Sequence, residues 1–175
     1  FADCDHLTDI TIPNGVTIIE DHAFLRCKKL TKVTIPDSVT SIGNEAFYAC
    51  GRLTSVIISN SVTDIGNFAF GYCSNLRYVY CKPIVPPILS ANGPFRNRPT
   101  GQKIYVPRES VDAYKEAGDW VYYSSSIMGY DLPLIEETTN DVTDQFGRKY
   151  GMYGKGKINK LDYRFAISKP MPIQN

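Results

Sequence analysis

The chain has 175 residues, of which 43% are hydrophobic and 21% are charged, and its formal net charge is +1. This composition is typical of a folded protein, and it excludes the large basic excess that draws a protein to nucleic acid or to lipid headgroups. The sequence has no run of about 18 apolar residues, so it contains no candidate membrane-spanning helix.

The first half of the chain repeats every 23 residues. This spacing relates the members of a cysteine column, a leucine column and two columns of aliphatic residues. The cysteine column is Cys4, Cys27, Cys50 and Cys73, and the leucine column is Leu7, Leu30, Leu53 and Leu76. A fixed period of this length indicates a solenoid, in which each repeat forms one coil and neighbouring coils share a core.

Within one repeat, the alternation of polar and apolar residues predicts a strand that ends near Ile35, with Val33 and Ile35 on its inner side. Pro36 ends this strand because it lacks a backbone donor. A second short strand is predicted at 39–42, followed by a turn that brings Phe47 inside. Parallel stacking of the repeats predicts side-chain ladders, namely Thr8/Thr31/Thr54, Thr17/Thr40/Thr63 and Phe24/Phe47/Phe70.

The cysteines are interpreted as a column of buried thiols. A metal site or a disulfide framework is the alternative, but the short Cys-x-x-Cys pair typical of metal sites does not occur. Cys81 falls on the inward isoleucine column, which favours the buried-thiol interpretation.

The repeat reads C-x-x-L-T-x-[IV]-x-I-[PS]-x-x-V-T-x-I-x-x-x-A-F-x-x and resembles the BspA-like, or Treponema pallidum-type, leucine-rich repeats. The resemblance covers residues 1–82 with three full units. The following stretch resembles the C-terminal end of such proteins in gut Bacteroidetes. That end is carried by Val79–Lys82, the Pro86-Pro87 pair, Ile104–Pro107, Ser110–Lys115 and Trp120.

The resemblance implies a strand-rich leucine-rich-repeat solenoid with parallel stacked strands and a C-terminal cap. It also implies a secreted or cell-surface protein that adheres to host matrix proteins of the fibronectin kind or to other bacteria. It implies no catalytic residues. The first residues, 1–4, match the end of a repeat, so we expect further repeats and an export signal upstream.

An open solenoid end exposes strand edges and apolar columns, so the terminal unit must be atypical. Val111, Tyr114 and Ala117 share one side of a short predicted helix that ends at Gly118, and with Trp120 they can cover the last layer. An aromatic ligand site at Trp120 is the alternative.

The candidate binding residues lie between the inward columns of each strand and point to the opposite, usually concave, face. They vary between repeats while the core positions are constant, as a recognition surface requires. They are Asp9, Thr11, Lys32, Thr34, Ser55, Ile57, Tyr78 and Tyr80. The Ile57, Tyr78 and Tyr80 end is apolar and aromatic, as interface anchors often are, unless the loop at 83–103 covers it.

Enzyme chemistry finds little support in this sequence. His6 and His22 are the only histidines, and Ser124–Ser126 has no nucleophile-elbow context. We predict no catalytic residue, no metal ligand and no cofactor.

The extension after residue 131 is acidic up to residue 144 and basic from residue 145. A basic arm for anionic glycan or nucleic acid is one interpretation, and mutual neutralisation or a flexible tail is the favoured one. A faint calcium-loop pattern at 154–163 lacks the early carboxylates, so no calcium site is predicted. Residues 163–167 are a candidate strand.

The sequence therefore predicts repeats at 1–82, a capping region at 83–131 and a charged extension at 132–175. The predicted function is adhesion by a non-catalytic, extracellular or cell-surface module that binds a protein, without nucleic-acid binding. A glycan-binding module and an accessory domain of a larger secreted enzyme are the alternatives.

Overall fold

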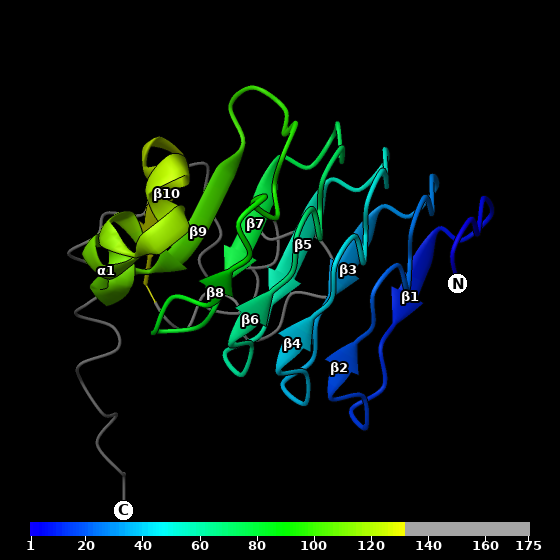
Figure 1. The fold of residues 1–175 in the computed structure, drawn as a ribbon, viewed down its shortest axis with the longest axis horizontal. Helices are drawn as coiled ribbons and strands as arrows, with labels where there is room; N and C mark the ends of the chain where they lie inside the picture. Colours follow the sequence, from blue (N-terminus) through cyan, green and yellow to red (C-terminus); the bar gives the residue numbers. More distant parts are fainter. Residues whose placement is uncertain (132–175) are drawn as a thin grey trace, which may run out of the picture. The chain divides into compact units, whose positions relative to one another are not determined.

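The computed structural model describes residues 1–131, which form two parallel sheets stacked as successive coils (Figure 1). The calcium-loop pattern, the strand predicted at 163–167 and the rest of the extension lie outside the described residues. The larger sheet contains, in spatial order, β1 (Asp9–Thr11), β3 (Lys32–Thr34), β5 (Ser55–Ile58), β7 (Tyr78–Cys81), β9 (Lys103–Pro107) and β10 (Ile127–Tyr130). The smaller sheet contains β2 (Ile18–Ile19), β4 (Ser41–Ile42), β6 (Asp64–Ile65) and β8 (Ile88–Leu89).

The register of the sheets reproduces the sequence period. Ile10 pairs with Val33, Val33 with Val56, and Val56 with Val79, so each coil advances by the same interval as the cysteine column. The next step pairs Val79 with Ile104, which shows that the fourth coil contains two extra residues. The predicted leucine-rich-repeat solenoid with parallel stacked strands is therefore confirmed.

Turns form the third side of each coil, and we call this side the turn face (residues 20–26, 43–49, 66–72 and 90–97). Backbone hydrogen bonds join these turns between coils: the Phe24 N–H donates to Ala46 O at 2.7 Å, and the Phe47 N–H donates to Ala69 O at 2.7 Å. Two positions in each coil have a left-handed backbone although they are not glycine. They are His22, Glu45 and Phe68 at one position, and Arg26, Ala49 and Tyr72 at the other, with φ between 52° and 59°.

The predicted ladders are present in the core. Phe24, Phe47 and Phe70 stack with ring centroids 5.0 and 5.1 Å apart. Phe1 and Phe95 extend the ladder at its two ends. The threonine ladders are also confirmed, although the hydroxyls of Thr31, Thr40, Thr54 and Thr63 donate to a backbone carbonyl in the preceding coil and not to another hydroxyl.

The cysteine column is buried, as predicted. Cys27, Cys50, Cys73 and Cys81 are enclosed in the core, and all five cysteines are free thiols. Each buried thiol of the repeat column donates to a backbone carbonyl, as Cys50 Sγ does to Phe24 O at 3.2 Å. Burial raises the pKa of Cys27 to about 11 and that of Cys81 to about 12.

Helical segments replace the smaller-sheet strand in the last coil. The connection from β9 to β10 contains the 3-10 helix η1 (Arg108–Ser110), helix α1 (Val111–Glu116) and the 3-10 helix η2 (Gly118–Ser126). Tyr114 and Trp120 are buried there. No helix within residues 1–131 is long and apolar enough to cross a membrane.

Trp120 belongs to the core, so the aromatic ligand site considered at this position is wrong. Its side chain is 1% exposed, and its Nε1–H donates to Pro87 O at 2.7 Å. The Tyr114 hydroxyl donates to Pro83 O at the same distance. These two hydrogen bonds fix the proline-rich segment 83–87 against the helical segments.

Candidate binding surface

The predicted binding residues form two adjacent columns on the outer side of the larger sheet. In the first column, Asp9 pairs in register with Lys32, Lys32 with Ser55, and Ser55 with Tyr78. Ser55 is half-buried, whereas the other three side chains are exposed. The surface changes along this column from charged residues to an aromatic ring, and Tyr78 is 45% exposed.

In the second column, Thr11 pairs with Thr34, Thr34 with Ile57, and Ile57 with Tyr80. The two threonines are exposed and Ile57 is half-buried. Tyr80 differs from the expectation of an exposed anchor because it is only 9% exposed. Its ring stacks on that of Tyr105, with the centroids 5.1 Å apart and the planes 12° from parallel.

Three further residues extend the two columns and were missed by the sequence reasoning. Lys103 continues the first column next to Tyr78, and Tyr105 continues the second next to Tyr80. Met128 on β10 follows Tyr105 and is exposed. The loop at 83–102 does not interrupt the sheet here, because β9 lies directly beside β7. The alternating apolar pattern of residues 104–106 was the available signal.

The outer side of the sheet is therefore a regular surface with graded chemistry. Strands held by parallel ladders keep each side chain at a fixed spacing from its neighbour, about 4.8 Å per coil. Lys32 and Lys103 have no carboxylate within 4.0 Å among residues 1–131, so both cations remain available to a partner.

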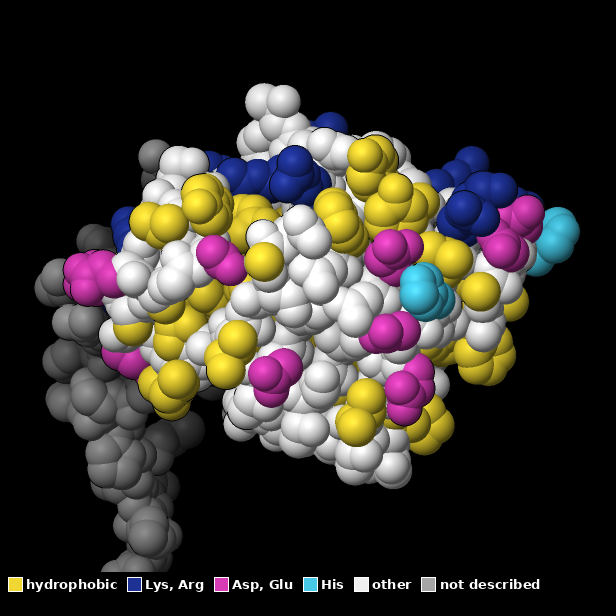
Figure 2. All heavy atoms as spheres, in the orientation of Figure 1, with side chains coloured by type: hydrophobic (Ala, Val, Ile, Leu, Met, Phe, Trp, Pro, Cys, Tyr) yellow, Lys and Arg dark blue, Asp and Glu magenta, His cyan; other side chains and the backbone are white. Residues whose placement is uncertain are grey.

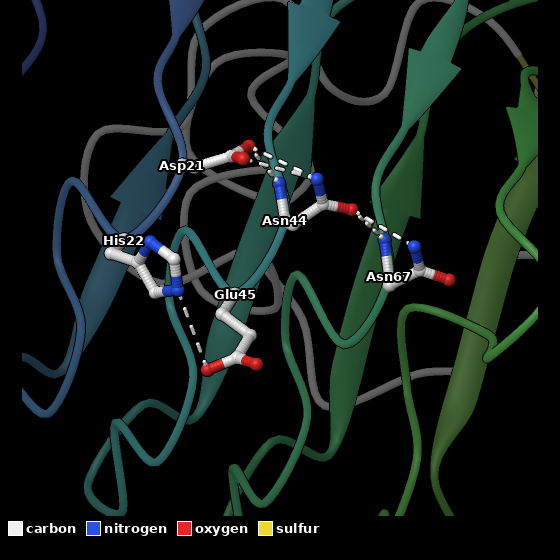
Figure 3. Close-up of polar contacts among 5 residues, drawn as sticks. All are labelled: Asp21, His22, Asn44, Glu45 and Asn67. Atoms are coloured by element: carbon white, nitrogen blue, oxygen red, sulfur yellow. Dashed lines mark hydrogen bonds and ion pairs between the residues drawn. The ribbon is translucent and has the colours of Figure 1, made fainter.

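A second row of polar side chains lies at the end of the smaller sheet (Figure 3). The Asn44 side-chain amide donates to Asp21 Oδ2 at 3.1 Å, and that of Asn67 donates to Asn44 Oδ1 at 3.0 Å. The backbone N–H groups of both asparagines donate to the same side chains as well, to Asp21 Oδ1 and Asn44 Oδ1. Hydrogen bonds from Asn44 lower the pKa of the Asp21 carboxyl group.

Glycine makes the close approach at this ladder possible. A Cβ on Gly66 would lie 2.6 Å from the backbone N of Asn44, and one on Gly43 would lie 2.6 Å from that of Asp21. Beside the ladder is a hollow of about 240 Å³ whose lining includes Ser41, Asp64 and Ile88. The ladder uses the polar groups of Asp21 and Asn44 to join coils, which is a structural role.

The histidines lie elsewhere on the surface. His22 Nε2 is 3.8 Å from Glu45 Oε2 (Figure 3). His22 is exposed, and Glu45 is half-buried. His6 Nδ1 is 3.4 Å from Lys29 Nζ. In the described part of the chain, no group of three or more His, Cys, Asp or Glu side chains is placed to hold a metal ion.

The repeats match a known family. A family model described as the BspA type leucine rich repeat region matches residues 1–128 in six copies. The chain belongs to the BspA-type leucine-rich-repeat family. The BspA-type match continues beyond residue 82, where the sequence resemblance to regular repeats ended, and it includes β9 and the start of β10. No curated protein matches the chain.

Membership in the BspA-type family indicates a protein-binding repeat module, and such repeats are typically associated with the cell surface. The matched residues include the first five strands of the larger sheet and the start of the sixth. Lys103, Tyr105 and Met128 therefore lie on strands within the BspA-type repeat region, next to the predicted columns.

Proposed function

We propose that this BspA-type region is a non-catalytic adhesion module of a secreted or cell-surface protein. In this proposal the outer side of the larger sheet binds a protein of the host matrix, fibronectin-like in kind. The observation that carries the proposal is the contrast between the two sides of one strand. Val33, Val56 and Val79 are the same on the inner side, while the paired outer residues Lys32, Ser55 and Tyr78 differ in each coil.

The aromatic end of the surface supplies the main contact in this proposal. Tyr78 offers a large, rigid and partly polar side chain that loses little conformational entropy on binding. Lys103 stands next to Tyr78 in register and adds a positive charge without a carboxylate neighbour among residues 1–131. In many protein interfaces a few aromatic and cationic side chains contribute most of the binding free energy, and Tyr78 beside Lys103 is such a combination.

Interferometry with immobilised fibronectin and fibrinogen tests the proposal. The double variant Lys32→Glu/Tyr78→Ala is expected to lower the affinity roughly 10-fold or more, since central anchors commonly contribute above about 2 kcal/mol. The matched control is Lys115→Glu/Tyr122→Ala, which makes the same changes at exposed positions on α1 and η2.

Unchanged affinity in the Lys32→Glu/Tyr78→Ala variant would contradict the assignment of binding to this sheet. An equal loss in the control would also contradict it, because a general charge effect would then explain the result. The circular dichroism spectrum of each variant verifies that the sheets are intact.

A further inference from the structure

Positive charge is concentrated in the middle of the chain. Between residues 46 and 108 the sequence contains seven basic residues and one acidic residue, Asp64. The basic residues are Arg52, Arg77, Lys82, Arg96, Arg98, Lys103 and Arg108. Residues 1–131 together contain 12 basic and 13 acidic residues. The excess is therefore a local property of these coils, and the overall charge does not reveal it.

The fold gathers five of these side chains at the edge where the turn face meets the larger sheet. We call this edge the basic edge, and it consists of Arg52, Arg77, Arg96, Arg98 and Lys103. Figure 2 shows Lys and Arg side chains along the upper edge of the molecule, above the region where the strands begin, with hydrophobic side chains beside them.

Backbone and side-chain contacts place Arg77, Arg98 and Lys103 of the basic edge next to one another. The Lys103 N–H donates to Arg77 O at 2.8 Å. Arg98 Nη1 donates to Ser126 Oγ at 3.1 Å, and Ser126 comes directly before β10, whose Ile127 pairs with Ile104 of β9. The Arg98 guanidinium also lies over the Tyr123 ring, 4.8 Å from its centroid, so its position is fixed.

The basic edge is not neutralised within the described part of the chain. The ion pairs there join Arg26 to Asp3, Lys28 to Asp5, His22 to Glu45, and Arg108 to Asp131. No member of the basic edge has a carboxylate within 4.0 Å in residues 1–131. Arg26 and Lys28 are thus paired with carboxylates of the preceding coil, whereas the basic edge is left open to an anionic partner.

Aromatic rings adjoin the basic edge on the turn face. The Tyr48 and Tyr72 rings are 5.0 Å apart, and the Phe68 ring meets that of Tyr48 edge-on at 6.4 Å. Tyr72 is 48% exposed, and its N–H donates to Arg96 O at 2.9 Å, which brings the cluster to the basic edge. We call Tyr48, Phe68 and Tyr72 the aromatic cluster.

We propose that the basic edge and the aromatic cluster bind a sulfated polysaccharide. Arginine side chains donate paired hydrogen bonds to sulfate oxygens, as they do to phosphate and carboxylate. The apolar face of a sugar ring packs on exposed aromatic rings such as that of Tyr72. The members of the basic edge come before or at the start of three neighbouring strands, β5, β7 and β9, so their charges are distributed across several coils, which suits a linear polyanion.

The proposed polysaccharide site and the columns assigned to protein binding share a single residue, Lys103. The two proposals can therefore fail separately. A sulfated polysaccharide is favoured over a nucleic acid because BspA-type repeats are typically surface-associated, where such glycans are accessible.

The full chain is tested for binding to immobilised heparin, which serves as the sulfated polysaccharide, by interferometry at low and at physiological salt. The variant Arg77→Ala/Arg96→Ala is expected to bind roughly 10-fold more weakly, since two charge-assisted hydrogen bonds are lost. The control Lys82→Ala/Lys115→Ala removes the same charge outside the basic edge and outside the two binding columns, and is expected to stay within about 2-fold of the parent.

A second pair of variants tests the aromatic cluster. Tyr72→Ala is expected to weaken heparin binding roughly 5-fold, because base or sugar stacking on a ring contributes on the order of 1 kcal/mol. Tyr122→Ala removes an exposed tyrosine from η2 and is expected to have no effect. Arg77→Ala/Arg96→Ala should retain its affinity for fibronectin, which separates this site from the outer side of the sheet.

Several outcomes would overturn the proposal. Parental affinity in both site variants would place heparin binding elsewhere, for example in residues 145–175, which contain seven basic residues. Equal binding of desulfated heparin would remove sulfate as the recognised group. Tighter binding of single-stranded DNA than of heparin, with the same sensitivity to Arg96 and Tyr72, would assign the site to nucleic acid.

Discussion

Within residues 1–131, the first and last coils have similar apolar columns but are covered differently. In the first coil, Leu7 and Ile10 are only half-buried, whereas Leu30 and Val33, their equivalents one coil later, are fully buried. In the last coil, the chain between β9 and β10 forms α1 and η2, and Trp120 of η2 is 1% exposed. The same apolar columns therefore become a core only where another layer covers them.

This difference shows that burial in a solenoid is a property of neighbouring coils and not of residue type. Phe1 and Phe24 occupy the same column and stack at 5.6 Å, yet Phe1 is 75% exposed and Phe24 is buried. The helical connection between β9 and β10 supplies such a covering layer for the last coil of the described residues.

Substitution of an aromatic residue at each end gives the largest expected contrast. Trp120→Ala should lower the free energy of unfolding by about 3–5 kcal/mol, because it leaves a cavity and also removes the hydrogen-bond partner of Pro87 O. Phe1→Ala should cost less than about 1 kcal/mol, since its ring is mostly in solvent. Urea unfolding followed by circular dichroism measures both, because Trp120 is the only tryptophan and its fluorescence is lost in the first variant. An equal loss of unfolding free energy in both variants would mean that Phe1 is buried to the same extent as Trp120.

Glycine positions sharpen the contrast between the packed interior coils and the first coil. Gly66→Ala should destabilise the fold by about 1–3 kcal/mol, because the new Cβ would lie 2.6 Å from the backbone of Gly43 and Asn44. Gly15→Ala is the matched control, since its Cβ would meet no atom within 4 Å. Thermal unfolding of both variants decides the point, and a Gly66→Ala variant as stable as the control would show that the coils can separate locally.

Acid should weaken the hydrogen bonds between Asp21 and Asn44 before it affects the packing of the apolar core. The pKa of Asp21 is below its ordinary value of 3.8 in the folded state, mainly because of hydrogen bonds from Asn44. A lowered folded pKa means that this stabilisation is present above pH 3.8 and is lost as the pH falls through the folded pKa. Asn44→Ala should therefore make unfolding less dependent on pH in this range, by an effect smaller than that of Gly66→Ala.

The measurement is a series of urea titrations from strongly acidic to near-neutral pH for the parent and for Asn44→Ala. Thr40→Ala is a useful comparison, because its hydroxyl donates to Thr17 O and involves no titrating group. An unchanged pH dependence in Asn44→Ala would show that the amide does not stabilise the Asp21 carboxylate.

Thiol reactivity distinguishes the coils without altering stability. Cys4 in the first coil is half-buried, whereas Cys27 and Cys81 are buried, and their raised pKa values of about 11 and about 12 leave few thiolates at mildly alkaline pH. Iodoacetamide labelling read by peptide mass spectrometry should modify Cys4 at least about 100-fold faster than either of them. Similar rates would indicate that the interior coils open as often as the first one.

The sequence was sufficient for the features that repeat at a fixed interval. The Phe24/Phe47/Phe70 ladder, the threonine ladders and the buried thiols all follow from equivalent residues in register. The burial of Tyr114 and Trp120 was predictable for a different reason, since their large apolar side chains follow the regular repeats, where an open stack would need covering.

Features that break the period could not be predicted from it. Lys103 and Tyr105 pair with Tyr78 and Tyr80 at a longer interval than the regular one, because two residues are inserted in the fourth coil. A search at the regular period therefore does not align them with the predicted columns. The burial of Tyr80 was missed for the same reason, since its stacking partner lies on β9.

The aromatic cluster has a similar explanation. Tyr48, Phe68 and Tyr72 belong to three different columns of the repeat, so the period gives no sign that they meet. Gly71 takes the place that Tyr48 has one coil earlier, and a Cβ there would lie 3.0 Å from Phe68. One irregular residue thus makes room for a contact that depends on the fold in three dimensions.

The left-handed turn positions have a consequence for how such a surface can diversify. A non-glycine residue in this conformation costs roughly 1 kcal/mol, yet His22, Glu45 and Phe68 occupy equivalent sites in successive coils. The backbone there is imposed by the hydrogen-bonded neighbouring turns, so the choice of side chain is left to selection for contact. Each duplicated coil therefore adds two outward positions at which almost any residue type is compatible with the backbone. The packed core tolerates the small loss of stability that these positions cause.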